Sequence, residues 1–175
     1  MVNFTSSIRK MKKTASLLII SMLIFSGCKD GDEYPIEPVI SFKSLSTDKD
    51  ANGKDVAGHI TISFTDGDGD LGLSASDTLS PYHRSGPYHY NFVIVYYEKI
   101  NNVWTVVSTS TPFSGRFPLL TSEGKNKALR GDISQEVFLR QGVTNLSTKY
   151  DVFIYDRALH RSNTITTSEL VINTN

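Results

Sequence analysis

His59-Ile60-Thr61-Ile62-Ser63-Phe64-Thr65 alternates apolar and polar side chains with a period of two. Successive side chains of a β-strand point to opposite faces, so Ile60, Ile62 and Phe64 would share one buried face. This pattern is typical of a strand that is half covered by a core. No stretch from residue 39 onward shows a long helical period, so the sequence predicts an all-β domain.

Further runs of β-branched and aromatic residues predict strands on both sides of this one. These runs cover residues 39–42, 90–100, 103–107, 127–139, 150–155 and 164–172. Asn101-Asn102 is expected to form the turn of a hairpin, and Gly131 to mark a β-bulge in its strand. Residues 43–54 and 66–88 are rich in turn-forming residues and are predicted to be loops.

About seven strands at short spacing, with turn signals between them, favour an antiparallel β-sandwich of immunoglobulin-like type over residues 39–175. The chain lacks the paired cysteines of antibody domains, because Cys28 is its only cysteine. Trp104 does not fall on the strand that would carry the buried Trp of those domains. The expected fold therefore depends on the number and order of the strands, and a small β-barrel is the alternative.

The N-terminal part has the order of an export signal. A basic segment ends at Lys13, an apolar run of 11 residues covers 15–25, and Ser26-Gly27-Cys28 follows. The apolar run is too short for a membrane-spanning helix, which needs about 20 residues, but it fits a secretory signal peptide. We therefore predict a signal peptide over residues 1–27. Met11 opens a complete signal of ordinary length, and we expect the natural start there.

A lone cysteine after small residues at the cleavage point resembles the lipobox of bacterial lipoproteins, with Phe25 where that family most often has Leu. The resemblance implies that the Cys28 thiol takes a diacylglycerol, that the peptide is cut before it, and that the new N-terminus is acylated. Lys29 and the acidic residues after it resemble the surface-export signal of some Gram-negative outer-membrane lipoproteins. The alternative is a soluble acidic tether. Residues 28–38 are expected to be a flexible tether to the outer membrane.

Charge and motif content exclude several classes of function. Removal of residues 1–27 would leave 14 basic and 18 acidic residues, a balance that argues against nucleic acid as a partner. The sequence contains no Gly-x-Ser-x-Gly, no His-Glu-x-x-His and no phosphate-binding loop. We therefore expect no enzyme activity, and cysteine catalysis is excluded if lipid occupies Cys28.

Asp66-Gly67-Asp68-Gly69-Asp70 places three carboxylates at alternate positions in the first long loop. Ca²⁺ takes about six to eight oxygen ligands, and flexible glycines let one short loop wrap around it. The run resembles calcium loops that begin Asp-x-Asp-x-Asp, and Asp77 stands at the twelfth position. Leu71 occupies the sixth position, where an EF-hand has Gly, so we expect a calcium site in a β-sandwich loop. A solvated acidic turn is the alternative.

Topology adds Asp156 to these candidate ligands. If 59–65 is strand B and 150–155 is strand F of an immunoglobulin-like sandwich, the B–C and F–G loops lie at the same end. Asp156 begins the F–G loop and would provide a fourth carboxylate near Asp66. The alternative is an Asp that stabilises its own turn.

Other features are less specific. Aromatic and basic residues gather near the end of the first long loop, in Tyr82-His83-Arg84 and Tyr88-His89-Tyr90. They predict either a binding surface or a connection whose rings pack onto the sandwich. The four histidines lack zinc-ligand spacing, and Arg130-Gly131-Asp132 falls inside a predicted strand.

Together the features of the sequence favour a lipid-anchored envelope module that binds a glycan, a peptide or an envelope protein, or is structural. The first alternative is an accessory subunit of an outer-membrane surface complex without a ligand of its own, and the second is an enzyme of unrecognised type.

Overall fold

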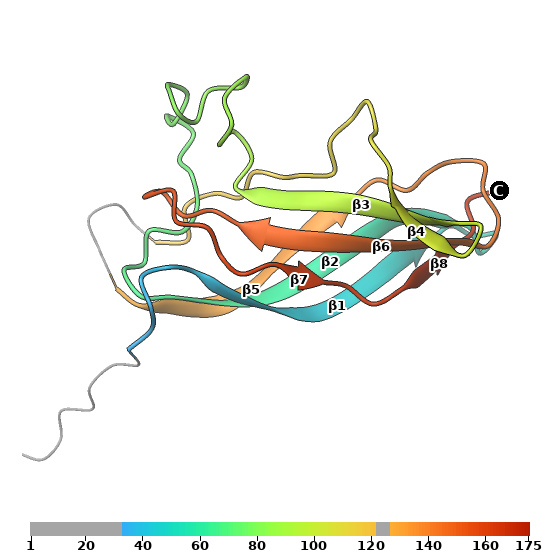
Figure 1. Ribbon diagram of the computed structural model, residues 1–175, viewed down its shortest axis with the longest axis horizontal. Helices are drawn as coiled ribbons and strands as arrows, with labels where there is room; N and C mark the ends of the chain where they lie inside the picture. Colours follow the sequence, from blue (N-terminus) through green and yellow to red (C-terminus); the bar gives the residue numbers. More distant parts are fainter. Residues whose placement is uncertain (1–32, 122–126) are drawn as a thin grey trace, which may run out of the picture. The chain divides into compact units, whose positions relative to one another are not determined.

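The computed structural model describes residues 33–121 and 127–175, and this part of the chain is an antiparallel β-sandwich. Its strands form two sheets that face each other across one core (Figure 1). Within the described ranges, no helix has the length and apolar character needed to cross a bilayer. The predicted signal peptide and its Cys28 lie outside the described residues.

The first sheet contains three strands and the second contains five, in the orders β1-β2-β5 and β4-β3-β6-β7, with β8 also paired to β6. The first is built from β1 (Val39–Lys49), β2 (Asp55–Asp66) and β5 (Leu129–Val137). The second is built from β3 (Phe92–Ile100), β4 (Val103–Val106), β6 (Leu146–Ile154), β7 (Ile165–Thr166) and β8 (Leu170–Ile172).

This strand order is that of an immunoglobulin-like sandwich. β1, β2 and β5 take the places of strands A, B and E, and β4, β3, β6 and β7 take those of C′, C, F and G. The sheets remain separate rather than closing into a barrel. The predicted fold class is therefore confirmed, with eight strands in the described residues where about seven were expected.

The core explains why β2 alternates so regularly. Ile60, Ile62 and Phe64 are buried, as their spacing predicts, and they face the inner side chains of the second sheet. The residues between them point outward and are half-buried. The core cluster includes Ile40, Phe92, Ile94, Tyr96, Ile133, Val137, Tyr150, Val152 and Ile154. Leu71 and Phe117, from two long connections, pack into the same cluster.

Three local predictions were wrong. Residues 43–49, predicted as loop, continue β1 and pair with β2 after a register shift between Phe42 and Ser44. Gly131 forms no bulge, because β5 pairs with β2 in unbroken register and Gly131 lies opposite Phe64. The last predicted strand, 164–172, is interrupted between β7 and β8, where buried Thr167 exchanges hydrogen bonds with the Tyr150 backbone.

Candidate metal centre

The aspartate loop starts at the end of a core strand and is fastened by two buried leucines. Asp66 is the last residue of β2. Leu71 and Leu73 point into the interior, and their backbones hydrogen-bond the neighbouring connection at Leu120 and Phe117. The loop therefore has a fixed position between residues 66 and 73, although it contains no regular strand.

Two glycines are required by the packing around this loop. Gly69 has φ +73°, and a Cβ atom there would lie 2.0 Å from the carbonyl oxygen of Lys127. A Cβ atom at Gly67 would lie 2.2 Å from the Tyr34 carbonyl oxygen, and the Gly67 amide donates to Pro35. Residues 34 and 35, predicted as part of the flexible tether, thus pack against the aspartate loop.

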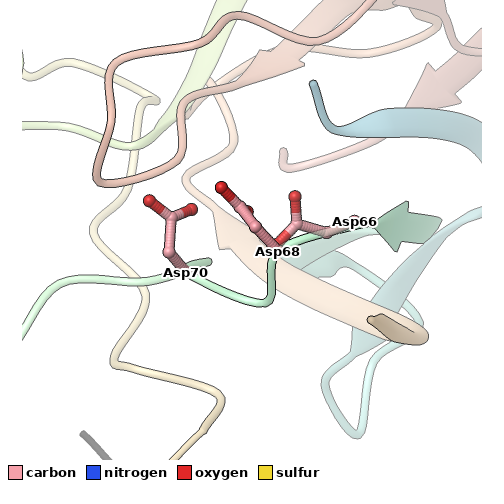
Figure 2. Close-up of side chains that lie close together, drawn as sticks. All are labelled: Asp66, Asp68 and Asp70. Carbon is pink, nitrogen blue, oxygen red and sulfur yellow. The ribbon is translucent and has the colours of Figure 1, made fainter. Parts of the chain in front are cut away.

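The three alternating carboxylates converge. One carboxylate oxygen from each of Asp66, Asp68 and Asp70 lies within 4.8 Å of the others, and the side chains point to the same side of the loop (Figure 2). Asp66 is fully buried at 0% exposure, and neither of its carboxylate oxygens has a hydrogen-bond partner among the described residues. One buried oxygen of Asp68 and one of Asp70 also lack a partner there.

The electrostatics of this cluster are unfavourable without a cation. Burial raises the pKa of Asp66 to about 7, and the negative charges of Asp68, Asp70 and Asp156 add to the increase, which the nearby Asp70 backbone amide opposes only in part. Burial and the charge of Asp156 also raise the pKa of Asp70. A buried carboxylate without a hydrogen bond or counter-charge is costly, so this arrangement calls for a positively charged ligand.

Asp156 lies on the other loop, as the topology predicted, and its charge acts on Asp66 and Asp70, but its carboxylate is not among the three that converge. The loops that follow β2 and β6 lie at the same end of the sandwich (Figure 1). The Ala158 amide donates to Asp70 Oδ2 at 3.0 Å, which links the two loops directly. Asp156 is buried and accepts hydrogen bonds from the His160 amide (2.7 Å) and pairs with His160 Nδ1 (2.8 Å).

Asp77 lies apart from the converging carboxylates and has partners of its own. Its Oδ2 accepts the Ser74 amide at 2.7 Å, and its Oδ1 accepts Arg157 Nη2 at 3.1 Å. The ion pair connects the first long loop to the F–G loop. The position predicted as a twelfth-residue ligand thus contributes to loop packing.

The aromatic residues of the long loop pack onto the sandwich. The Tyr82 hydroxyl donates to the Arg157 carbonyl, and the Tyr88 ring meets Tyr155 edge-on at 5.0 Å between ring centroids. Arg116 donates to the backbone carbonyls of Ser74 and Asp77 in the same loop, among others. No local sequence pattern indicates this role of Arg116, because its partners are backbone oxygens far along the chain.

The remaining sequence motifs have ordinary structural roles. Arg130-Gly131-Asp132 lies within β5, where Asp132 pairs with Lys43 at 2.5 Å and accepts a hydrogen bond from Ser63 at 2.6 Å.

Comparison with known protein families, curated proteins and solved structures finds no significant match to this chain.

The converging ligands are all oxygen atoms. Carboxylates and backbone carbonyls suit hard cations, whereas zinc and copper sites generally include imidazole or thiolate. Asp66, Asp68 and Asp70 could hold such a cation directly, and Asp156 could add a fourth carboxylate through lone pairs that His160 does not use. The loop origin of these ligands fits the adaptable coordination geometry of Ca²⁺ better than the strict octahedron of Mg²⁺.

Proposed function

We propose that this chain is a lipid-anchored protein of a bacterial cell envelope, whose sandwich is stabilised by calcium and serves as a binding or structural module. The observation that carries the calcium proposal is Asp66, which is fully buried with both carboxylate oxygens unpartnered among the described residues. Three more carboxylates contribute negative charge to its environment. A solvated acidic turn does not account for a buried and unpaired charge of this kind.

Calcium would act on the long loop as well as on the aspartates. Asp70 accepts the Ala158 amide, and Arg157 next to it pairs with Asp77 in the far part of the same loop. A cation that holds Asp70 in place therefore favours the contact between the B–C and F–G loops. Ordering a long loop costs conformational entropy, and metal binding is one way to offset that cost.

The envelope location is supported by the sequence, with its short apolar run and the lipobox-like Ser26-Gly27-Cys28. Mass spectrometry of the protein purified from membranes tests it. We expect a mature chain that begins at Cys28 and carries a diacylglycerol and an N-acyl group. A chain with an unmodified cysteine, or with residues 1–27 still attached, would remove the anchor from the proposal.

Thermal unfolding of the full chain tests the calcium site. Ca²⁺ at about a hundredfold excess over its dissociation constant should stabilise the fold by about 2.7 kcal/mol relative to excess chelator, which is a rise in Tm of roughly 5–10 °C. Equal concentrations of Mg²⁺ should give a much smaller rise. An unchanged Tm in calcium and chelator would argue for the solvated turn.

A further inference from the structure

A cavity of about 390 Å³ lies toward the other end of the sandwich, away from the aspartate loop. Its lining includes the inner side chains of Tyr96 and Glu98 on β3, the connection that follows β4, and residues just after β5. β3 begins at Phe92 beside the aspartate-loop end, and Glu98 stands six residues further on. At about 3.3 Å per residue, this places Glu98 roughly 20 Å along the strand.

The cavity lining includes an ion pair between a buried carboxylate and a half-exposed guanidinium. Glu98 is 2% exposed, accepts the Tyr96 hydroxyl at 2.9 Å and pairs with Arg140 Nη1 at 2.6 Å. The Arg140 side chain is 56% exposed. Because a guanidinium has five N–H donors in a planar fork, the exposed part of Arg140 can still donate to a ligand. The pair thus offers guanidinium donors to a ligand but has no net charge.

The walls are apolar and partly aromatic. Phe138 follows the last residue of β5 and is 65% exposed, while Val137 and Leu139 on either side are buried. The half-buried Phe113 ring packs against Tyr96, with ring centroids 4.6 Å apart. The rim includes the hydroxyl-bearing residues Thr109, Ser110 and Thr111. A large exposed ring at the mouth of a cavity with polar groups in its lining is a common element of small-ligand sites.

We propose that this cavity binds a neutral saccharide unit. The C–H face of a pyranose packs on an exposed aromatic ring, and its hydroxyl groups both donate and accept hydrogen bonds. Because Glu98 already neutralises the Arg140 guanidinium, the cavity has no net charge to attract a charged ligand, and the remaining guanidinium donors suit the hydroxyl groups of a sugar. The volume of about 390 Å³ is within the usual range of small-ligand pockets.

This inference gives a ligand class to the module proposed above, but the saccharide site shares no residue with the calcium site. The saccharide proposal and the calcium proposal can therefore be tested and rejected independently of each other. Saccharide binding is expected to persist in excess chelator, and the calcium-dependent Tm shift is expected in the absence of sugar. Saccharide binding that is lost in chelator would place it at the aspartate-loop end and overturn the assignment to this cavity.

Ligand-observed NMR and titration of the full chain test the proposal. The probes are glucose, galactose, mannose and N-acetylglucosamine, with glucuronic acid and glucosamine as charged counterparts. We expect at least one neutral sugar to bind with a millimolar or lower dissociation constant, and more tightly than either charged sugar. No binding by any neutral sugar at about 10 mM, or tighter binding by a charged one, would overturn the proposal.

Two variants and one control locate the binding. Phe138→Ala removes an exposed ring and should weaken the sugar about fivefold to tenfold without loss of stability. Arg140→Lys keeps a positive charge for Glu98 but removes the planar fork, and should also weaken binding. Leu79→Ala, at an exposed position outside the cavity lining, should have no effect. Unchanged affinity in Phe138→Ala would show that the sugar binds elsewhere.

Discussion

Asp66 is the residue at which burial and charge conflict most strongly. Its raised pKa reflects the cost of holding a carboxylate among other carboxylates away from water. Replacement by Asn removes the charge and keeps the size of the side chain. We therefore expect Asp66→Asn to be at least as stable as the wild type in chelator at pH 8, and to lose the stabilisation by calcium. Thermal unfolding with and without calcium measures both effects.

Asp132→Asn is the matched control for this variant, because Asp132 is a half-exposed carboxylate paired with Lys43 on β5. It should retain the full calcium-dependent Tm shift. If Asp66→Asn also kept that shift, the buried carboxylate would have a purely structural role.

Asp55 is also a buried carboxylate, but unlike those of Asp66 both of its carboxylate oxygens accept hydrogen bonds. It accepts Thr47 Oγ1 at 2.7 Å, Lys49 Nζ at 2.6 Å and the Asn173 amide at 2.8 Å. Burial alone would raise the pKa of Asp55, but these hydrogen bonds outweigh it and lower the pKa below its usual value. Asp55 therefore connects the β1–β2 turn to the C-terminal segment.

Asp55→Asn should lower the free energy of unfolding at pH 7 by about 1–3 kcal/mol. A carboxylate with a lowered pKa stabilises the fold above its unfolded pKa, and this contribution is lost as the pH falls through the folded pKa. The difference in unfolding free energy between the wild type and Asp55→Asn should therefore become smaller below about pH 4. Urea unfolding of both proteins at pH 7 and at pH 3 measures this difference. An equal difference at the two pH values would show that the negative charge of Asp55 does not contribute to stability.

At the scale of elements, the aspartate loop requires glycine for two separate reasons. Gly53 and Gly69 both have positive φ, but a Cβ atom at Gly53 would meet no heavy atom within 4 Å, whereas one at Gly69 would clash with the Lys127 carbonyl. Gly53→Ala should cost about 1–2 kcal/mol from backbone strain alone. Gly69→Ala should cost at least about 3 kcal/mol and weaken calcium binding. Urea unfolding measures both losses of stability, and equal losses in Gly53→Ala and Gly69→Ala would mean that the loop can move away from Lys127.

The core strands could be predicted from the sequence because one face of each is buried. β2 is the clearest case, with Ile60, Ile62 and Phe64 in the core. The second half of β1 was missed because it is a polar edge segment, in which Leu45 is one of the few side chains that pack against the core. Its strand structure comes from backbone pairing with β2, which leaves no alternating pattern in the sequence.

At the scale of the whole molecule, the strand order predicted a part of the site that the local Asp-Gly motif could not. It placed the F–G loop beside the aspartate loop and therefore Asp156 near Asp66, as the structure has it. It could not reveal that the Ala158 amide binds Asp70 or that residues 34 and 35 pack against Gly67. These contacts depend on backbone atoms, which every residue type shares.

Asp77 shows the limit of predicting ligands from spacing. Its place twelve positions along the loop suggested a ligand, but the loop bends so that Arg157 pairs with its carboxylate. The path of the chain between residues 71 and 77 decides this, and Arg116 contributes to that path by donating to the carbonyls of Ser74 and Asp77.

Calorimetric titration of Ca²⁺ into the chelator-stripped full chain at pH 7.5 measures whether the aspartate loop takes up the ion. We expect saturable binding of one ion per chain, with weaker binding of Mg²⁺ and no binding heat in Asp66→Asn. A wild-type chain that takes up no calcium at millimolar concentration would rule out the calcium site, because the buried and unpartnered carboxylate of Asp66 would then have no counter-charge.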